Sequence, residues 1–339
     1  MKFLLVCDYW YGSAGWSYSH TLEELGCQLA IFDYRRRRVQ WRPGRPRLMK
    51  RGLDLVDQVV MNQQLLRCAK AVRPEVILVT KGETLFPRTL TKLRSCGRPV
   101  LLNYNADSPF NPVNSSRALL ASIPVYDCHF AWGKHLIEPL YEAGARRVEY
   151  LPFGYDPALF HAVAVGEEER RRYACDVCFA GTWEPAREHI LQELVGWDLS
   201  VWGNMWENVP QDSPLRPHLK GAAIYAEELC RRLESAKIIL NFLRAQNDGA
   251  TNMRTFEIPG FGGFLLTTRS KEQCDFFTEG KEIECFGSVE ELRAKILYYL
   301  THDDEREAIA HAGHERALAE HTLERRLKQL LTVAERLRK

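Results

Sequence analysis

The chain has 339 residues, of which 45% are hydrophobic and 27% charged, with a formal net charge of +2. These are ordinary values for a globular protein, and the near-neutral charge excludes an overall attraction to nucleic acid or membrane. The length exceeds what one hydrophobic core usually serves, which predicts two domains of about 150 to 170 residues each.

The cysteines and the N-terminus predict a cytoplasmic protein. Ten cysteines are scattered along the chain without a disulfide framework, so we expect reduced, mostly buried thiols. Cys175 and Cys178 form a CxxC pair, but no second pair follows at zinc-site spacing, which favours a buried strand over a metal or redox site. The N-terminal stretch turns polar after about six apolar residues, too short for a signal peptide or a membrane span. We therefore expect no transmembrane segment.

Short apolar runs rich in Val, Ile, Leu and Phe recur through the first half of the chain. They lie at 3–9, 29–34, 75–80, 99–105, 126–132 and 148–153, with helical patterns between them, notably at 53–72 and 135–145. Strands that alternate with helices indicate right-handed crossovers and a parallel, doubly wound sheet.

The same rhythm restarts after a polar stretch at 161–174, which is the best linker candidate. Predicted strands follow at 175–181, 199–204, 237–243, 263–268 and 282–287, and predicted helices include 224–236, 289–302 and a charged tail from Asp303. The fold class is therefore α/β with two Rossmann-like domains, at 1–160 and 161–320, and a final helix at 321–339. Ligands of such sheets bind at the carboxyl ends of the strands, so we expect a cleft where two such edges meet.

Glycines mark the turn after the first predicted strand. Gly12 and Gly15 stand where a helical pattern begins, so a ligand can approach the backbone there and a helix N-terminus attracts an anion. The stretch lacks the third glycine of a dinucleotide fingerprint, which argues against NAD. Gly12 and Gly15 are thus a candidate acceptor or phosphate loop.

Asp107 follows the fourth predicted strand. Pro109 favours an extended Ser108 and ends the strand, so Asp107 is expected at the carboxyl edge of the sheet. It is a candidate catalytic base or sugar-positioning group, whereas an N-cap or an Asx-turn would explain the same residue structurally.

The second half repeats the strand, glycine and helix sequence at 179–191. Gly181 and Thr182 lie at the turn and Arg187 follows on the helix. Two amides, a hydroxyl and a guanidinium would suit a diphosphate there. The alternative is that Arg187 is a solvated helix residue.

Further along, a polar loop leads into a helix that carries Asn252, Arg254 and Glu257. Asn252 and Arg254 are candidates for contacting a phosphate or a sugar, and a carboxylate at 257 can accept both vicinal hydroxyls of a ribose. The acid precedes a glycine kink and an apolar strand, where an unpaired buried charge would be costly. We therefore predict that Glu257 holds a ligand.

Metal chemistry has no support in the sequence. Neither a D-x-D nor an H-E-x-x-H motif occurs, and His311 and His314 lie on a polar helix. We expect no metal and no cofactor, so that helix N-termini and arginines neutralise the diphosphate of a substrate.

The segment from Arg35 to Arg51 carries nine Lys or Arg and no acid. A solvated loop would explain it. Its one-sided charge in a near-neutral chain also suggests an anionic partner.

The C-terminal third resembles the glycosyltransferase group 1 superfamily, most closely its CgeB-like (spore maturation protein) branch. The similar stretches are ILNFLRAQNDGATNMRTFEIPGFGGFLLTT at 239–268, the segment 280–331, and LPFGYDPALF at 151–160. The resemblance is specific over roughly 148–160 and 175–332, and general elsewhere.

This resemblance implies the GT-B fold, with two facing Rossmann-like domains, a donor held mainly by the second, an acceptor held mainly by the first, and a terminal helix that crosses back. In the superfamily an E-x7-E motif flanks the donor. Glu257, followed by Gly262, resembles its second Glu, while Gly249 stands where the first is expected, so a retaining or inverting outcome stays open. Asp107 matches only the location of a catalytic residue.

Together these features predict a metal-independent glycosyltransferase that uses a nucleoside-diphosphate-sugar, UDP-linked or a close relative. A nucleotide-sugar epimerase of the same fold is one alternative. A non-catalytic nucleotide-sugar binding module, suggested by Gly249, is another. The acceptor and the oligomeric state are left open.

Overall fold

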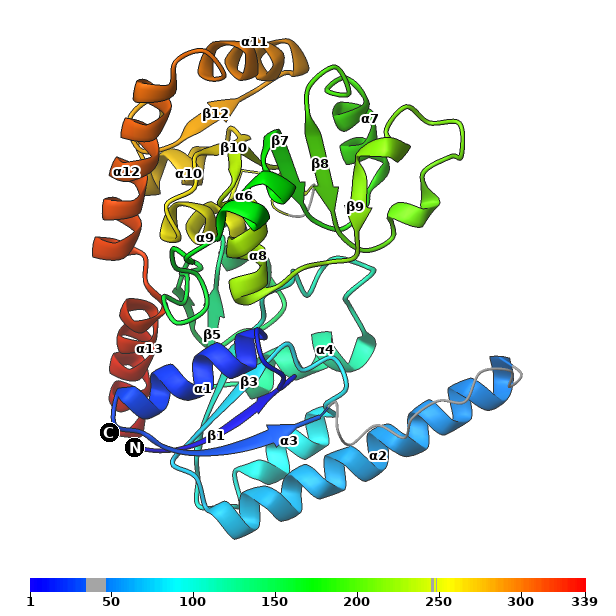
Figure 1. Ribbon diagram of the computed structural model, residues 1–339. Helices are drawn as coiled ribbons and strands as arrows, with labels where there is room; N and C mark the ends of the chain where they lie inside the picture. Colours follow the sequence, from blue (N-terminus) through cyan, green and yellow to red (C-terminus); the bar gives the residue numbers. More distant parts are fainter. Residues whose placement is uncertain (35–46, 245–246, 248) are drawn as a thin grey trace. The chain divides into compact units, whose positions relative to one another are not determined.

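The computed structural model describes residues 1–34, 47–244, 247 and 249–339, and only the backbone at 47–55. Most of the basic run at 35–51 therefore lies outside the described residues. The chain divides into two compact units, Met1–Pro152 with Glu324–Lys339, and Phe153–Leu323 (Figure 1). The stretch 161–174 lies inside the second unit and includes a helix.

The first unit is built around a six-stranded parallel sheet in the order β2-β1-β3-β4-β5-β6. Its strands are β1 (Lys2–Cys7), β2 (Gln28–Asp33), β3 (Val76–Thr80), β4 (Val100–Tyr104), β5 (Cys128–Ala131) and β6 (Val148–Tyr150). Its helices are α1 (Ala14–Glu24), α2 (Arg47–Val72), α3 (Pro87–Leu93), α4 (Arg117–Ser122), α5 (Ile137–Glu142) and α13 (Leu323–Arg338), the last beginning one residue before the unit boundary. β3 and β4 are buried along their whole length, as expected for strands covered by helices on both faces.

The second unit repeats this plan with the strand order β12-β11-β10-β7-β8-β9. Its strands are β7 (Cys175–Ala180), β8 (Leu199–Trp202), β9 (Leu219–Gly221), β10 (Ala236–Asn241), β11 (Leu265–Thr268) and β12 (Glu284–Phe286). Its helices are α6 (Glu167–Tyr173), α7 (Pro185–Gln192), α8 (Ala226–Leu233), α9 (Arg254–Gly260), α10 (Lys271–Phe276), α11 (Val289–Tyr299) and α12 (Asp303–Glu320).

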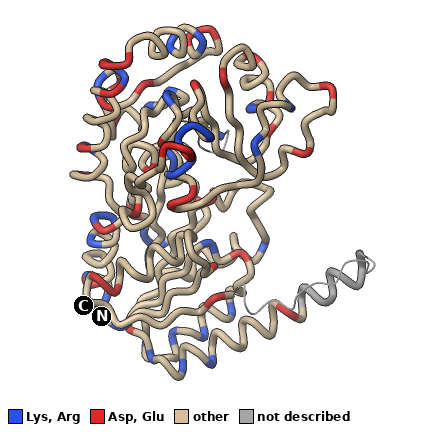
Figure 2. Tube along the Cα trace, in the orientation of Figure 1, with Lys and Arg blue, Asp and Glu red and all other residues tan. Residues whose placement is uncertain are grey.

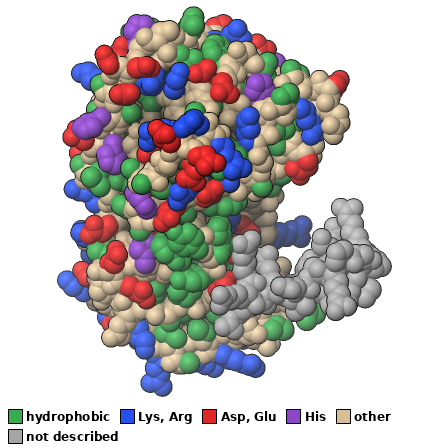
Figure 3. Space-filling model, in the orientation of Figure 1, with side chains coloured by type: hydrophobic (Ala, Val, Ile, Leu, Met, Phe, Trp, Pro, Cys, Tyr) green, Lys and Arg blue, Asp and Glu red, His purple; other side chains and the backbone are tan. Residues whose placement is uncertain are grey.

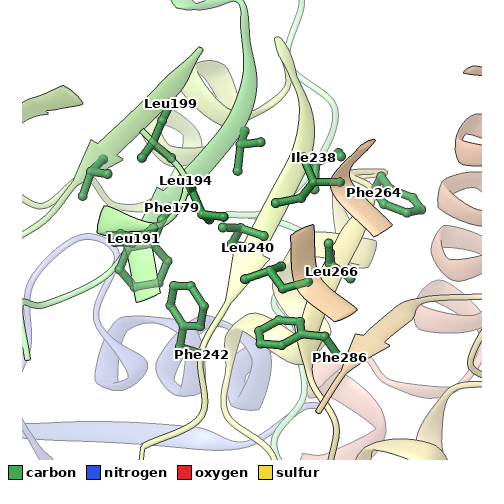
Figure 4. Close-up of a cluster of buried hydrophobic side chains, with 14 of the residues drawn as sticks. Phe179, Leu191, Leu194, Leu199, Ile238, Leu240, Phe242, Phe264, Leu266 and Phe286 are labelled. Carbon is green, nitrogen blue, oxygen red and sulfur yellow. The ribbon is translucent and has the colours of Figure 1, made fainter. Parts of the chain in front are cut away.

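The core of the second unit lies between its central strands and their covering helices. Apolar side chains of Leu240, Leu266 and Phe286 come from three adjacent strands and point into one cluster with Phe242 and Leu191 (Figure 4). Because successive side chains alternate across a strand, the other face needs its own helices. The sequence pattern of short apolar runs separated by helices follows from this two-sided burial.

Helix α6 shows how charge order supports a helix. Its first turn holds Glu167, Glu168 and Glu169, and its last turn holds Arg170, Arg171 and Arg172. Acids near the positive N-terminal end of the helix dipole and bases near its negative C-terminal end both stabilise the helix. Figure 2 shows acids and bases gathered together on this short segment.

The predicted α/β class with two parallel sheets is confirmed. The final helix belongs to the first unit, as the resemblance implied. The short strand β9 was not predicted, because three partly exposed residues give no periodic signal. All ten cysteines are free thiols, most of them buried.

Candidate functional site

The candidate donor site lies at the carboxyl edge of the second sheet. β7 and β10 are neighbours in the sheet. The next strand after β7 is added toward one edge of the sheet and the next after β10 toward the other, so their ends form a topological switch point. Gly181 and Thr182 directly follow β7, and the loop after β10 leads into α9. The structure thus brings the predicted residues from 181–182 and 252–257 to one edge.

Backbone segments crowd together at this edge. A Cβ on Gly203, after β8, would stand 1.8 Å from the carbonyl oxygen of Gly181, and Gly203 has a φ of +155°. The indole Nε1 of Trp206 donates to the same carbonyl at 2.9 Å, and the amide of Trp183 donates to Asn204 at 2.9 Å. Only glycine fits at 203, since the turns after β7 and β8 interlock.

A pocket opens beside this crowded backbone. Its lining includes Gly181, Thr182, Trp202, Asn204, Tyr225 and Arg254. The ring of Tyr225 is exposed, whereas Trp202 is buried under the guanidinium of Arg232, 4.4 Å from the ring centroid. Trp202, Asn204 and Tyr225 were missed by the sequence reasoning. Trp202 and Asn204 lie at the carboxyl end of β8, which was predicted, so the rule for carboxyl ends would have identified them. Tyr225 follows β9, which was not predicted.

Glu257 is 3% exposed and forms an ion pair with Arg254 one turn earlier in α9. Arg254 reaches from this buried carboxylate to the pocket, where a quarter of its side chain is exposed. Its Nε is buried and has no hydrogen-bond partner among the described residues. The protein therefore leaves one donor of this guanidinium unsatisfied, while another part of the side chain lines the pocket.

Arg187 has a different environment from the one predicted. It is 7% exposed, and its Nη1 and Nη2 donate to the carbonyls of Thr182 at 2.8 Å and Phe242 at 3.0 Å. Burial lowers the pKa of the guanidinium to about 10, so it remains charged at neutral pH. Arg187 thus ties the turn after β7 to the segment after β10, and it is not a solvated helix residue.

Asn252 is also held by protein groups. It exchanges two amide hydrogen bonds with Asn241 at the end of β10, of 2.8 and 3.1 Å, and its Oδ1 accepts from the amide of Thr255 at 3.2 Å. Asn241 donates in turn to Thr267 of β11 at 3.1 Å. Asn252 therefore fixes the start of α9 against the sheet.

Two glycines shape the rest of this segment. Gly262 has a φ of +91° and ends α9, with its amide donating to Pro259 at 2.9 Å. Gly249 has a φ of +72°, so a side chain at the position of the first motif acid would be strained. Its carbonyl accepts from the amide of Glu272 at 3.1 Å.

In the first unit, Gly12 and Gly15 flank Ser13, which caps α1. The Ser13 hydroxyl accepts from the amides of Trp10 at 3.2 Å and Trp16 at 3.1 Å. A Cβ on Gly15 would lie 2.2 Å from the Asp8 carbonyl, so this glycine lets α1 pack against the end of β1. Gly12 has a φ of +88° and forms the turn.

Asp107 lies beyond the carboxyl end of β4, as predicted. Its Oδ2 pairs with Lys81 Nζ at 2.8 Å, and its amide donates to Asn105 Oδ1 at 3.0 Å in an Asx-type turn. Lys81 follows the neighbouring strand β3 with a φ of +62°. The Asx-type turn fits the structural interpretation of Asp107, and its catalytic role stays a prediction.

The described part of the chain contains neither a metal-binding cluster nor a helix suited to a membrane. No group of three or more His, Cys, Asp or Glu side chains there could hold a metal ion. Among the same residues, no helix is long and apolar enough to cross a membrane.

The chain is similar to known glycosyltransferases in sequence and in fold. The family described as glycosyl transferase-like matches residues 184–332. HepE from Anabaena, in a crystal structure with UDP-glucose, gives a TM-score of 0.67 at 11% identity over 99% of each chain. Sucrose-phosphate synthase from Thermosynechococcus elongatus gives 0.69 at 12% identity, over 99% of this chain and 98% of that one.

A glycosyltransferase from Rickettsia africae gives a TM-score of 0.66 at 11% identity, over 100% of this chain and 98% of that one. None of the curated proteins matches the chain significantly. At such low identities the structural likeness shows the fold alone. The chain thus has a GT-B-like two-domain fold, and its residues 184–332 match the glycosyl transferase-like family.

Proposed function

We propose that this protein is a glycosyltransferase of the CgeB-like branch that moves a sugar from a nucleoside-diphosphate-sugar to an acceptor hydroxyl. One observation carries the proposal. At the carboxyl edge of the second sheet, a pocket joins the Gly181–Thr182 turn to Arg254, whose partner Glu257 is a buried carboxylate. Such a combination suits a diphosphate next to a sugar with vicinal hydroxyls.

The donor we propose is UDP-linked. Arg254 would bind the diphosphate through the exposed part of its side chain, with the turn at Gly181 and Thr182 beside it. Glu257 would accept the ribose hydroxyls. Arg187 and Asn252 would act as positioning residues for this site, because their polar groups bind the backbone and Asn241. The UDP-glucose complex of HepE, which has a similar fold, supports this choice of donor.

The proposed reaction balances without a redox partner. The bond from the anomeric carbon to the diphosphate oxygen breaks, and its electron pair leaves with the diphosphate. The acceptor oxygen forms the new bond to that carbon, and its proton passes to a base, for which Asp107 is the candidate. Catalysis would rest on stabilising the departing diphosphate and on orienting the acceptor.

Calorimetric titration with UDP and 2′-deoxy-UDP tests the ribose assignment. Glu257→Ala is expected to weaken UDP binding by about 1 to 3 kcal/mol, the scale of hydrogen bonds to a charged group. Wild-type protein should prefer UDP over 2′-deoxy-UDP, and Glu257→Ala should lose that preference. Glu320→Ala, an acid on α12, is the matched control and should bind like the wild type. An unchanged preference in folded Glu257→Ala would remove the ribose role.

We also propose that transfer needs no metal ion. Activity is expected to survive EDTA, since arginine and helix N-termini can carry the diphosphate charge. If EDTA abolishes turnover and magnesium restores it, the donor site works differently.

For the acceptor we propose an anionic group that the basic run 35–51 attracts. Exposed charges are screened over about 8 to 10 Å at physiological salt. The KM for the acceptor, but not for the donor, is therefore expected to rise with ionic strength. Reversing the charges of Arg36 and Arg37 should reproduce that rise at low salt. Equal salt dependence of both constants would leave the run without a role in substrate binding.

Product analysis separates the alternatives. Transfer of labelled sugar to an acceptor supports the proposal, sugar isomerisation without acceptor indicates an epimerase, and donor binding without turnover indicates a binding module.

A further inference from the structure

Three adjacent strands of the first sheet end in an unusual set of residues. β1, β3 and β4 are neighbours, and all run parallel, so the segments that follow them emerge at one edge. β1 is followed by a run of aromatic residues, β3 by Lys81 and β4 by Asn105 and Asp107. The buried apolar cluster described for the first unit does not include these residues.

The aromatic group consists of Trp10, Tyr11, Trp16 and His20. Tyr11 is 55% exposed, and its ring stands edge-on to Trp16 at a centroid distance of 5.0 Å. Trp16 packs in turn on the His20 ring at 4.4 Å. Figure 3 shows hydrophobic side chains gathered on the surface over the start of α1. Aromatic faces held in this way offer a rigid, partly apolar contact at low entropic cost.

Polar side chains follow the neighbouring strands β3 and β4 at the same edge. The amide of Asn105 is 6% exposed, its oxygen accepts from the Asp107 backbone, and its Nδ2 has no hydrogen-bond partner in the described part of the chain. Such a buried donor without an acceptor is uncommon and calls for a ligand or a water. The ammonium of Lys81 and the carboxylate of Asp107 are both partly exposed, at 40% and 20%. Together these side chains present donors and acceptors of hydrogen bonds.

The charge of this group opposes an anion. Burial lowers the pKa of Lys81, but the hydrogen bond to Asp107 and the charges of Asp107, Glu83 and Asp8 outweigh it and raise the pKa. Three carboxylates therefore surround one ammonium. A phosphate or carboxylate placed here would be repelled, whereas a neutral hydroxyl compound would not be.

We propose that this edge is an acceptor subsite for the uncharged ring of a pyranose sugar, with Tyr11 and Trp16 against its C–H face and Asn105, Lys81 and Asp107 on its hydroxyls. The inference rests on the proposed function and narrows its acceptor. An anionic group attracted by the basic run would have to lie elsewhere on the acceptor, because the hydroxyl that reacts enters a net acidic surrounding.

The backbone after β3 has an unusual conformation at this edge. Lys81 and Gly82 follow β3 with φ values of +62° and +93°, and a non-glycine residue in the left-handed region is strained. This conformation carries the Lys81 side chain to Asp107 across the edge. Strain of this kind is concentrated at functional positions.

Saturation-transfer NMR on the full chain, without donor, tests the proposal. The probes are neutral methyl pyranosides of glucose, galactose and mannose, with glucuronate and galacturonate as the matched anions. We expect at least one neutral pyranoside to bind in the millimolar range, with transfer to its ring C–H protons, and the anions to bind more weakly. Tyr11→Ala and Asn105→Ala should each weaken this binding by about five- to tenfold, while Tyr11→Phe should retain it.

UDP titration of the same variants separates this inference from the proposed function. Unchanged UDP binding shows that the second unit is intact, so a loss of sugar binding is local. The inference fails if no neutral pyranoside binds, if the uronates bind more tightly, or if Tyr11→Ala binds as well as the wild type. If the wild-type protein does not bind UDP, the proposed function is contradicted. The sugar titration would still show whether the first unit binds a pyranoside.

Discussion

Both sheets are parallel, but the side chains at their carboxyl edges differ in how far the protein itself pairs and buries them. At the edge of the second unit, polar groups are used by the protein itself: Arg187 holds two carbonyls, Asn252 is paired with Asn241, and the Gly203 backbone touches Gly181. At the edge of the first unit, aromatic rings and an ion pair are partly exposed.

If both edges bind a ligand as proposed, they differ in what would contact it. In the second unit, packed backbone turns form a fixed cradle on one side of the pocket. In the first unit, side chains themselves form the surface, and they can vary without disturbing the strands. A fixed cradle suits an invariant nucleotide, and a side-chain surface suits an acceptor that differs between enzymes.

The largest effect is expected from Gly203→Ala. The new Cβ would meet the Gly181 carbonyl at 1.8 Å, and relief of that overlap requires the interlocked turns to move. We expect destabilisation of the second unit by more than about 3 kcal/mol, measured by urea unfolding with hydrogen exchange to locate the change. Gly26→Ala is the control, since its φ is +80° but no atom lies within 4 Å, and should lose about 1 kcal/mol. Equal losses would show that the cradle is not rigid.

A matched pair of cations tests the contrast directly. Arg187→Met leaves the carbonyls of Thr182 and Phe242 without their donors in a buried place, and is expected to lose about 3 kcal/mol. Lys81→Met removes an ion pair that is partly exposed and should lose less than about 1 kcal/mol. Unfolding midpoints of both variants check this. Comparable losses of stability would mean that the two cations contribute similarly to holding their edges together.

Acid should weaken the first unit before the second. His129 of β5 is buried and its Nε2 donates to the Ile123 carbonyl at 2.9 Å, and burial lowers the pKa of the ring to about 4. Because the unfolded chain binds the proton more tightly, this contribution is present above pH of about 6.5 and is lost as the pH falls toward 4. Between pH 7 and pH 5 we expect a loss of about 2 kcal/mol.

Hydrogen exchange in β4 and β5 measures that loss, and His129→Gln, which keeps a donor but does not titrate, should flatten the pH dependence. A profile that is unchanged by the substitution would assign the acid sensitivity to other groups.

The smallest effect is expected at an exposed charge network of the second unit. Arg269 contacts Glu279 and Glu291, and these bonds lower the pKa of Glu291 to about 2. The groups are largely exposed, so Arg269→Ala should lose less than about 1 kcal/mol and still less in high salt. Thermal unfolding at two salt concentrations checks this. A larger, salt-independent loss would show that the network is shielded from solvent.

The sequence predicted the fold well because strand and helix periods are local. Every predicted strand is present, from 3–9 to 282–287. The roles predicted for Gly181, Asn252 and Glu257 stay predictions. The environment of Arg187 was not predicted, since a basic residue on a helix is usually solvated, and its two carbonyl partners lie in different segments of the chain.

Contacts between side chains that follow different strands could not be predicted from the sequence either. Lys81 forms an ion pair with Asp107 because β3 and β4 are adjacent in the sheet. The order of strands in a sheet cannot be predicted from a local sequence pattern. Asn105 was predicted only as the last residue of the strand 99–105. Its role was not foreseen, because burial without a partner is seen only when the side chains are placed.

The first unit is discontinuous in sequence, because it includes residues 324–339, whereas the second is one continuous segment. Leu327 and Leu330 of α13 are fully buried, so the first unit lacks part of its core until they are made. Domains generally fold as units during synthesis, the N-terminal one first. In this chain the order is reversed at the last step: the ribosome releases the final helix only after the second unit is complete, and the half of the protein that is translated first is expected to be finished last.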